Sequence, residues 1–333
     1  MELTTVWFIL ITVLWVGYLV LEGFDFGVGI LMPVLARNDI ERRVILNTIG
    51  PVWDGNEVWL LVAGGATFAA FPEWYATLFS GFYLPLLIIL VALIVRGVAF
   101  DYRGKREDVL WRKRWDIAIF VCSLLPAILW GVALANIVHG VPIDSHKEYA
   151  GSFFTLLNPY ALLGGLTTLA LFVTHGAVFI ALKTLGDVRE RANEFALWAG
   201  VVAAGFAVVF LTWTVFDSGN AASAVFAVLA AAALVSGLGA VRLQRDGWAF
   251  VGTALAIGFA TISLFWGLFP DVMPSTLDPA WSLTTANASS TPYTLKIMTW
   301  VAFAFTPIVL LYQSWSYWVF RKRIGTQHIA VHG

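Results

Sequence analysis

Two pairs of acidic residues lie inside otherwise apolar stretches of this chain. Glu22 and Asp25 belong to VLEGFDFGVGIL, and Asp54 and Glu57 belong to PVWDGNEVWLL. An ionisable group at bilayer depth costs about 3 kcal/mol on insertion scales, so such groups usually face a protein interior and handle ions, protons or ligands. A spacing of three places each pair on one face of a helix. These residues therefore suggest proton or ion chemistry inside a membrane protein.

The composition is that of an integral membrane protein. Of the 333 residues, 59% are hydrophobic and only 12% are charged, and the mean hydropathy is +0.81. So few charges cannot cover a water-soluble protein of this length. We therefore expect one polytopic membrane domain over residues 1–333, in contact with lipid and not with nucleic acid. The single cysteine, Cys122, excludes a disulfide framework.

Nine apolar segments are long enough to cross a bilayer, because a helical crossing needs about 20 residues. This pattern predicts an all-α integral membrane fold with nine transmembrane helices. We expect the first segment to be retained, since it is longer than the apolar core of a signal peptide. The nine segments are 6–35, 50–71, 76–100, 116–139, 158–182, 195–216, 221–241, 248–269 and 295–320.

The basic residues are concentrated in alternate links between these segments. Of the 20 Lys and Arg residues, 18 fall on one side of the predicted membrane, and only Lys147 and Lys296 fall on the other. Positively charged loops mark the cytoplasmic side of a membrane protein. We therefore expect a multi-pass protein with its N-terminus outside and its C-terminus in the cytoplasm.

The direction of the first three segments places the charged residues at one depth. Glu22 and Asp25 lie in the inner half of the first segment, and Asp54 and Glu57 lie in the inner half of the second. Arg96 lies about one turn from the cytoplasmic end of the third. We predict an inward-facing cluster of four carboxyl groups and one guanidinium. One guanidinium cannot balance four carboxylates, and groups poised between protonation states can relay protons.

Two interpretations of this cluster are open, and they are compatible. In the first, Arg96 forms a buried salt bridge with Asp54 or Asp25 that locks the first three helices together. In the second, at least one of the four acids conducts protons. Asn56 is expected to contribute hydrogen bonds in either case.

Two tryptophans, Trp53 and Trp59, lie beside the acids of the second segment. Their position suits packing against a cofactor or a partner. Ordinary core packing explains them equally well, so both interpretations are kept.

The histidines do not predict a conventional bis-histidine haem site. His139 lies at the outer end of the fourth segment, and His175 lies about 17 residues into the fifth, about 25 Å deeper. The two cannot ligate one iron from opposite faces. A pair of His139 with Met298 near the outer surface is the remaining alternative, and His175 is expected to be a hydrogen-bonded interior residue.

At its motifs the sequence resembles subunit II of the cytochrome bd quinol oxidases. The resemblance follows nearly the whole chain, and the order of the motifs is more specific than any single motif. The motifs are EGFDFGVG at 22–29, RNDIERR at 37–43, WDGNEVWL at 53–60, AGGATFAAFP at 63–72, FSGFY at 79–83, VRGVAFDYR at 95–103, LNPYALLGG at 157–165, MPS at 273–275, and LKIMTWV and PIVLLYQSWSYW near the end.

The resemblance implies a fold of two four-helix bundles plus one peripheral helix. It also implies a partner, subunit I, bound through a pseudo-twofold interface, and in some members small accessory subunits. The complex would oxidise quinol at the outer face of the bacterial cytoplasmic membrane and reduce O2 to water with cytoplasmic protons, so that aerobic electron transport generates a membrane potential.

The resemblance also bears on cofactors. Subunit I of this family carries the ligands of two b-type haems and one d-type haem, so neither a metal site nor a complete active site is expected in this chain. Ubiquinone and menaquinone both stay open as the quinone, and a quinone bound by this subunit occurs in some members.

Several residues match positions with roles in that family. Asp25 and Asp54 match the acids of its proposed proton route toward the haems. Arg96 and Asp101 match the basic and acidic positions of its RGVAFDYR-like stretch, and Trp59 matches a tryptophan near a proposed oxygen path.

Two acids match less closely, because Glu57 is glutamine in some members and aspartate may replace Glu22 in others. We assign them a supporting role in the proton route. The 217–221 connection is short here where some relatives carry a long insertion, so no contact of that insertion is transferred to this chain.

Two other functions are compatible with the residues alone. Glycine-interrupted helices with acids at membrane depth also suit a proton-coupled secondary transporter. A purely structural scaffold would also contain buried charges, but it would tolerate neutral substitution of all four acids once it had folded.

Overall fold

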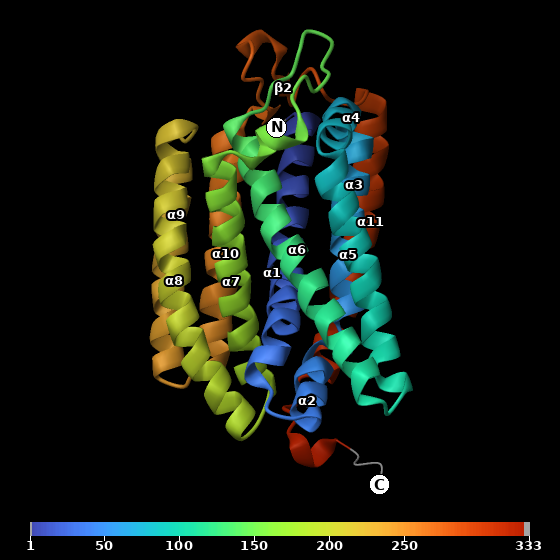
Figure 1. The fold of residues 1–333 in the computed structure, drawn as a ribbon. Helices are drawn as coiled ribbons and strands as arrows, with labels where there is room; N and C mark the ends of the chain where they lie inside the picture. Colours follow the sequence, from blue (N-terminus) through green and yellow to red (C-terminus); the bar gives the residue numbers. More distant parts are fainter. Residues whose placement is uncertain (1, 330–333) are drawn as a thin grey trace.

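The structure is a computed structural model that describes residues 2–329. Its helices run roughly parallel to one another, with short connections at both ends of the molecule (Figure 1). The helices are α1 (Leu3–Leu35), α2 (Asp39–Ile49), α3 (Trp53–Ala70), α4 (Pro72–Gly81), α5 (Tyr83–Tyr102), α6 (Val109–His139), α7 (Pro159–Lys183), α8 (Asp187–Asp217), α9 (Ala221–Arg242), α10 (Asp246–Leu268) and α11 (Pro292–Val319). Two short strands, β1 (Asp271–Met273) and β2 (Leu283–Thr284), complete the regular structure.

Eight helices in the described part of the chain are long and apolar enough to cross a membrane, which agrees with the predicted all-α membrane fold. They are α1, α5, α6, α7, α8, α9, α10 and α11, and their bounds differ from the predicted segments by up to eight residues. The predicted segment 50–71 corresponds to α3, which has only 18 residues and begins with a polar turn. The number of nine crossings therefore stays a prediction.

One predicted segment was wrong. The segment 76–100 is not one helix, because α4 ends at Gly81 and α5 starts at Tyr83. Gly81 packs so closely on Tyr149 that a Cβ atom would lie 2.7 Å from its ring, so glycine is needed where the chain turns. The link after the first segment contains a helix, α2, whose start is capped because the side chain of Asn38 accepts a hydrogen bond from the backbone of Glu41.

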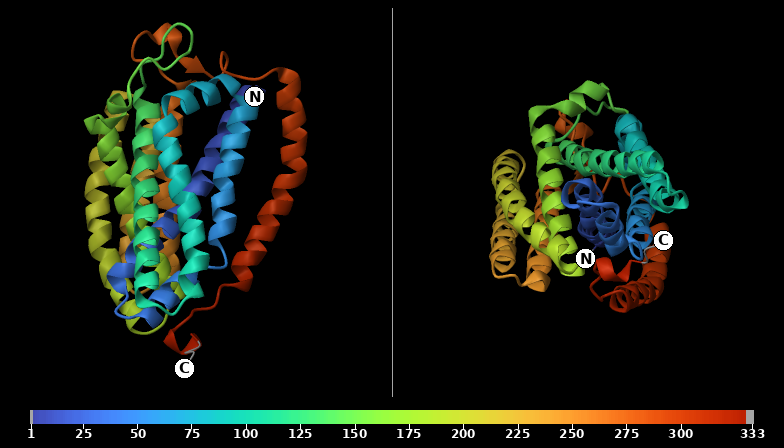
Figure 2. Two further views of the ribbon diagram at one scale, coloured as in Figure 1. Left: turned by 45° about the vertical axis from the view of Figure 1, so that its right-hand side comes forward. Right: turned by 60° about the horizontal axis from the view of Figure 1, so that its bottom comes forward.

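The long helix α1 lies at the centre of the molecule and packs against α3, α6, α7 and α10. Its glycines permit this close packing: a Cβ atom on Gly27 would lie 2.1 Å from the backbone oxygen of Phe172, and Gly176 of α7 faces Gly27 directly. Helices α7, α8, α9 and α10 pack on one another as a second group, and α7 also contacts α1 and α6 (Figure 2). The division into two four-helix bundles stays a prediction.

Helix α11 lies at the periphery, and Leu295 is its only buried residue. The left view of Figure 2 shows it standing apart from the other helices along much of its length. The segment after α11 returns beneath the bundle: Ile324 exchanges backbone hydrogen bonds with Lys183 and Leu185, and Arg323 forms an ion pair with Asp246 at 2.7 Å. Polar contacts at this end of the bundle thus hold a helix that has little apolar packing of its own.

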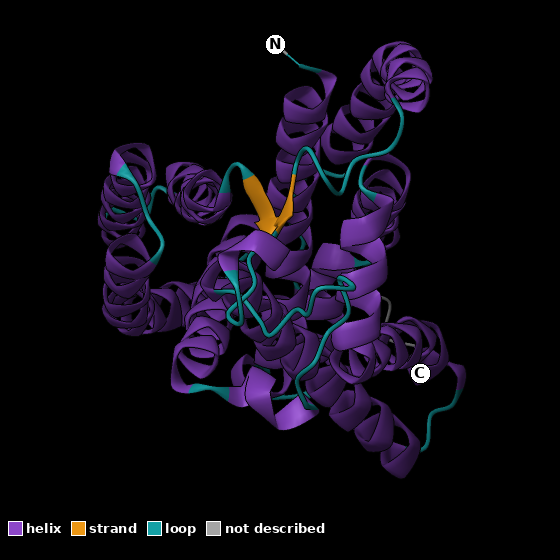
Figure 3. Ribbon diagram, turned by 90° about the horizontal axis from the view of Figure 1, so that it is seen from above, coloured by secondary structure: helices purple, strands orange, loops and turns teal. Residues whose placement is uncertain are grey.

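The opposite end is covered by the two longest connections, which lie over the helices when the molecule is seen from above (Figure 3). Val141 of the 140–158 connection forms a parallel bridge with Ser275, in the connection that carries β1 and β2. The two strands pair in antiparallel fashion. These contacts close the end of the bundle at which α1 begins.

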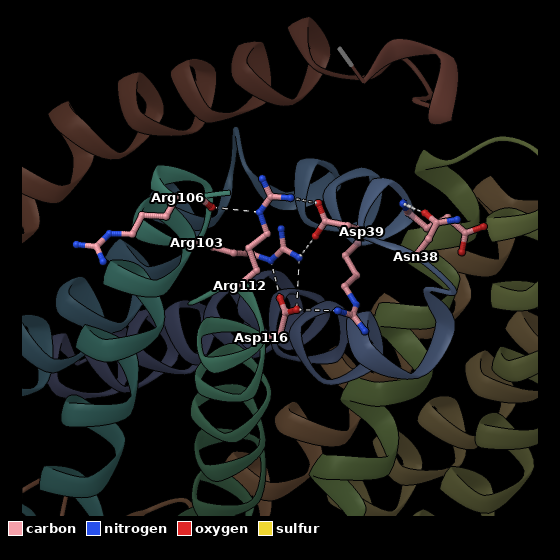
Figure 4. A network of polar contacts seen from close by, with 8 residues as sticks. Asn38, Asp39, Arg103, Arg106, Arg112 and Asp116 are labelled. Carbon is pink, nitrogen blue, oxygen red and sulfur yellow. Dashed lines mark hydrogen bonds and ion pairs between the residues drawn. The ribbon is translucent and has the colours of Figure 1, made fainter. Parts of the chain in front are cut away.

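The end at which α11 finishes carries a network of ion pairs (Figure 4). Arg103 lies between Asp116 of α6, with Nε 2.5 Å from Oδ1, and Asp39 of α2, with Nη2 2.6 Å from Oδ1. Arg112 also binds Asp39, and Arg42 binds Asp116. The network therefore joins α2 to α6 and to the turn after α5.

This network lowers the pKa of Asp39. Partial burial acts to raise that pKa, but the hydrogen bond from Arg103 and the positive charges of Arg103, Arg112 and Arg43 outweigh it. Because the pKa is lower in the folded than in the unfolded state, ionised Asp39 stabilises the fold above the ordinary aspartate pKa of about 3.9. That stabilisation is lost as the pH falls through the folded-state pKa.

We therefore expect Asp39→Asn to destabilise the protein at neutral pH by up to about 1 kcal/mol. The deficit should shrink below about pH 4, where wild-type Asp39 also becomes protonated. Thermal unfolding at a series of pH values measures it, and Glu107→Gln, at an exposed position outside the network, is the control. A deficit that stays constant at acidic pH would show that the ion pairs are not its cause.

Candidate functional site

The membrane-embedded charges meet where α1, α3 and α5 approach one another. Arg96 of α5 forms an ion pair with Glu22 of α1, and its Nη2 lies 2.7 Å from Oε1 of Glu57 of α3. The side chains of Arg96 and Glu22 are fully buried, whereas that of Glu57 is 22% exposed. Glu57 is thus the member through which this group reaches the surface.

Aromatic rings complete the surroundings of the guanidinium. Arg96 lies over the ring of Phe26, 4.6 Å from its centroid, and 5.7 Å from the centroid of Phe100. The negative face of an aromatic ring attracts a cation, most strongly when water is excluded. The rings therefore help to keep one positive charge fixed inside the bundle.

Asp25 lies one turn beyond Glu22 on α1 and is fully buried. Its Oδ2 atom accepts a hydrogen bond of 2.7 Å from Nδ2 of Asn56 on α3. The carbonyl oxygen of Asn56 in turn accepts hydrogen bonds from Tyr317, at 2.7 Å, and from Gln313, at 3.4 Å. Asn56 therefore connects the acid to α11, as its predicted hydrogen-bonding role requires.

Several atoms of the site have no hydrogen-bond partner among the described residues, although they are buried. They are Oε2 of Glu22, Oδ1 of Asp25, and Nε and Nη1 of Arg96. Three carboxyl groups share one guanidinium here and leave donor and acceptor atoms unpaired, which makes this group a candidate for proton exchange.

The predicted cluster of four acids is only partly correct. Glu22, Asp25 and Glu57 gather around Arg96, but Asp54 is exposed on the surface of α3. Successive residues of a helix are 100° apart, so Asp54 lies about 200° from Asn56, which faces inward. The predicted salt bridge of Arg96 with Asp54 or Asp25 is therefore replaced by pairs with Glu22 and Glu57.

Asp101 also lies outside the site. It is exposed on α5, about 140° around the helix from Arg96, and no polar contact joins it to Arg96. Its predicted electrostatic role therefore does not involve direct contact with the guanidinium.

The two tryptophans make different contacts. Trp53 packs against Phe100, with ring centroids 5.1 Å apart, and covers Gly97 of α5. Trp59 donates its indole N–H to Oε1 of Gln313 at 2.8 Å. Their suggested roles beside a cofactor or an oxygen path stay predictions.

The sequence analysis missed Gln313 and Tyr317. Both are half-buried on α11, four residues apart and therefore on one face of the helix. Gln313 is a polar residue within the apolar stretch PIVLLYQSWSYW, and that was the signal available in the sequence.

The two histidines within the helices are each hydrogen-bonded through one ring nitrogen. Nδ1 of His139 lies 2.7 Å from Asp217 at the C-terminal end of α6, and Nδ1 of His175 lies 2.7 Å from the hydroxyl of Thr253. His175 is also stacked on Phe250, with ring centroids 4.8 Å apart. Among the described residues, no group of three His, Cys, Asp or Glu side chains could hold a metal ion.

Comparisons with known proteins agree about the family of the chain. The family model for cytochrome bd terminal oxidase subunit II matches residues 3–320. Cytochrome bd ubiquinol oxidase subunit 2 of Bacillus subtilis (strain 168) is 43% identical over 330 residues, which cover 97% of both chains. Cytochrome bd-I ubiquinol oxidase subunit 2 of Escherichia coli (strain K12) is 38% identical over 362 residues, which cover 97% of this chain and 96% of that protein.

A solved structure is similar in fold. A chain of the bd oxidase from Geobacillus thermodenitrificans superposes with a TM-score of 0.78, over 97% of this chain and 100% of that one. The two sequences are only 19% identical, so this likeness concerns the fold alone.

The buried ion pairs predict the effect of removing Arg96. Arg96→Leu would leave Glu22 as a buried carboxylate without a cation, which costs about 3–5 kcal/mol. We expect a low yield of folded protein and a lower thermal midpoint, and Glu22→Gln in the same chain should recover much of the loss. Arg114→Leu, at an exposed position, is the control. Wild-type stability of Arg96→Leu would contradict the structural role.

Proposed function

Because the chain belongs to the cytochrome bd terminal oxidase subunit II family, we propose that it is subunit II of a quinol:dioxygen oxidoreductase in the membrane of a bacterium. The complex takes electrons from a quinol and reduces O2 to water. The full-length matches to proteins named ubiquinol oxidase subunit 2 carry this proposal. This chain then works only together with its partner, subunit I.

The haems of the complex belong to subunit I in this proposal, as two b-type haems and one d-type haem. The support for this division is the family membership of the chain. Subunit II accordingly supports the haem-bearing partner and contributes a path for protons.

The proton path consists of Glu57, Glu22 and Asp25, with Asp54 at its cytoplasmic end. Three buried or half-buried carboxyl groups around one guanidinium support it. Asp54 is in the first turn of α3, where it meets water first, and Glu57 lies one turn further along the same helix. The path passes cytoplasmic protons toward the oxygen-reducing site of subunit I.

The orientation follows from the charges. The ion-pair network of Asp39, Arg103 and Asp116 lies at the end of the bundle where α11 finishes (Figures 1 and 4). Arginine and lysine mark the cytoplasmic side, so this end faces the cytoplasm and α1 begins outside. The pseudo-twofold contact with subunit I, the lipid contacts and any accessory subunits belong to the same proposal.

The path predicts that Asp25→Asn slows the reduction of O2 by about a hundredfold, because a proton carrier is lost while the shape of the side chain is kept. Asp54→Asn should slow it less, since water can replace a surface carboxyl group. Oxygen consumption by the purified complex measures both rates, and the haem absorption spectrum shows whether the complex has assembled.

Glu194→Gln, at an exposed position on α8, is the control for these rates. Normal turnover of both aspartate variants would remove them from the path and favour a structural scaffold. Loss of assembly would favour the structural interpretation of the charged cluster. A chain that transports a solute by itself, without a haem-containing partner, would instead favour the secondary transporter.

A further inference from the structure

A series of hydrogen bonds leads from Trp59 of α3, through Gln313 of α11 and Asn56 of α3, to Asp25. The indole N–H of Trp59 donates to Oε1 of Gln313 at 2.8 Å, and Nε2 of Gln313 donates to Oδ1 of Asn56 at 3.4 Å. Tyr317 donates to the same oxygen at 2.7 Å, and Nδ2 of Asn56 donates to Oδ2 of Asp25 at 2.7 Å. Every donor in this series of hydrogen bonds points toward Asp25.

The direction of these hydrogen bonds is determined by Trp59, the first residue in the series. An indole N–H can only donate, so the oxygen of the Gln313 amide faces Trp59 and its NH2 group faces Asn56. The Asn56 oxygen then accepts from both Gln313 and Tyr317, which leaves its NH2 group toward Asp25. The orientation of an amide follows from its partners, and here the partners agree on one orientation.

This arrangement makes the two oxygens of Asp25 unequal. Oδ2 accepts the amide N–H of Asn56, and a carbonyl oxygen is a better acceptor than the oxygen of a carboxylic O–H, so a proton on Oδ2 would weaken this hydrogen bond. Oδ1 is buried and has no partner among the described residues. We propose that Trp59, Gln313 and Tyr317 are positioning residues that act through Asn56 and confine the exchangeable proton of Asp25 to Oδ1.

This inference rests on the proposed proton path and adds a direction to it. Protons can then leave Asp25 only on the side away from Asn56. Amide groups do not pass protons readily, so the same series of hydrogen bonds prevents protons from leaking toward the exposed face of α11. It also explains why a helix with almost no buried residue keeps Gln313 and Tyr317 half-buried.

Infrared difference spectroscopy of the intact complex tests the proposal. Asp25→Asn identifies the carboxylic C=O band of Asp25 by its loss. If the proton is on Oδ1, the carbonyl oxygen of Asp25 is Oδ2, which accepts the hydrogen bond from Asn56. Tyr317→Phe, Trp59→Phe and Gln313→Leu should each shift the band to higher wavenumber and slow oxygen consumption by about three- to tenfold.

Matched controls come from residues on the exposed face of α11. Tyr312 and Trp315 are 68% and 58% exposed, and Tyr312→Phe and Trp315→Phe should leave the band and the rate unchanged. A merely structural effect of altering α11 would lower the yield of complex in these variants too, but it would not move the band of Asp25. If Trp59→Phe does not assemble, Tyr317→Phe, which removes only a hydroxyl group, is sufficient for the test.

The outcomes separate this inference from the proton path. A band that disappears in Asp25→Asn but is unmoved in the α11 and Trp59 variants would overturn the positioning role and leave the path intact. A shifted band together with normal turnover of Asp25→Asn would overturn the path and keep the positioning role. If no carboxyl band depends on Asp25 at any pH, Asp25 holds no proton and the inference fails.

Discussion

The guanidinium of Arg96, buried between Glu22 and Glu57 and against the ring of Phe26, is the constraint on which the centre of the molecule depends. A positive charge with no access to water is tolerable only beside carboxylates, so α1, α3 and α5 must meet at this height. With Arg96 in place, further acids can be buried nearby, and Asp25 is held one turn away. The structural role of the cluster and its proposed role in proton transfer therefore have one origin.

Polar groups organise this protein at two levels. Within the bundle, Asn56 connects Asp25 to α11, which has only Leu295 buried and is otherwise held by hydrogen bonds and by the segment that follows it. At the end of the bundle where α11 finishes, Arg103 joins Asp39 to Asp116 and so fastens α2 beneath the helices that carry the site. Apolar packing brings the helices together, and these few polar contacts decide their register.

In the proposed complex, this chain leaves the redox chemistry to its partner. Its own contribution is the group of acids around Arg96, with Glu57 and Asp54 reaching the surface. In a member of the cytochrome bd terminal oxidase subunit II family, this arrangement suits a subunit that supplies protons to a redox centre held elsewhere. The polarity of the hydrogen bonds around Asp25 would then decide on which side a proton can leave.

The sequence by itself determined the membrane class, the approximate bounds of most helices and the shared depth of Glu22, Asp25, Glu57 and Arg96, because helical rise and chain direction depend only on position along the chain. It did not determine which way each side chain points. Only the tertiary structure decided that Asp54 faces outward and that Gln313 and Tyr317 of α11 reach Asn56, some 260 residues earlier in the chain. Helix rotation and the docking of a distant helix arise from packing between segments, and no local pattern records them.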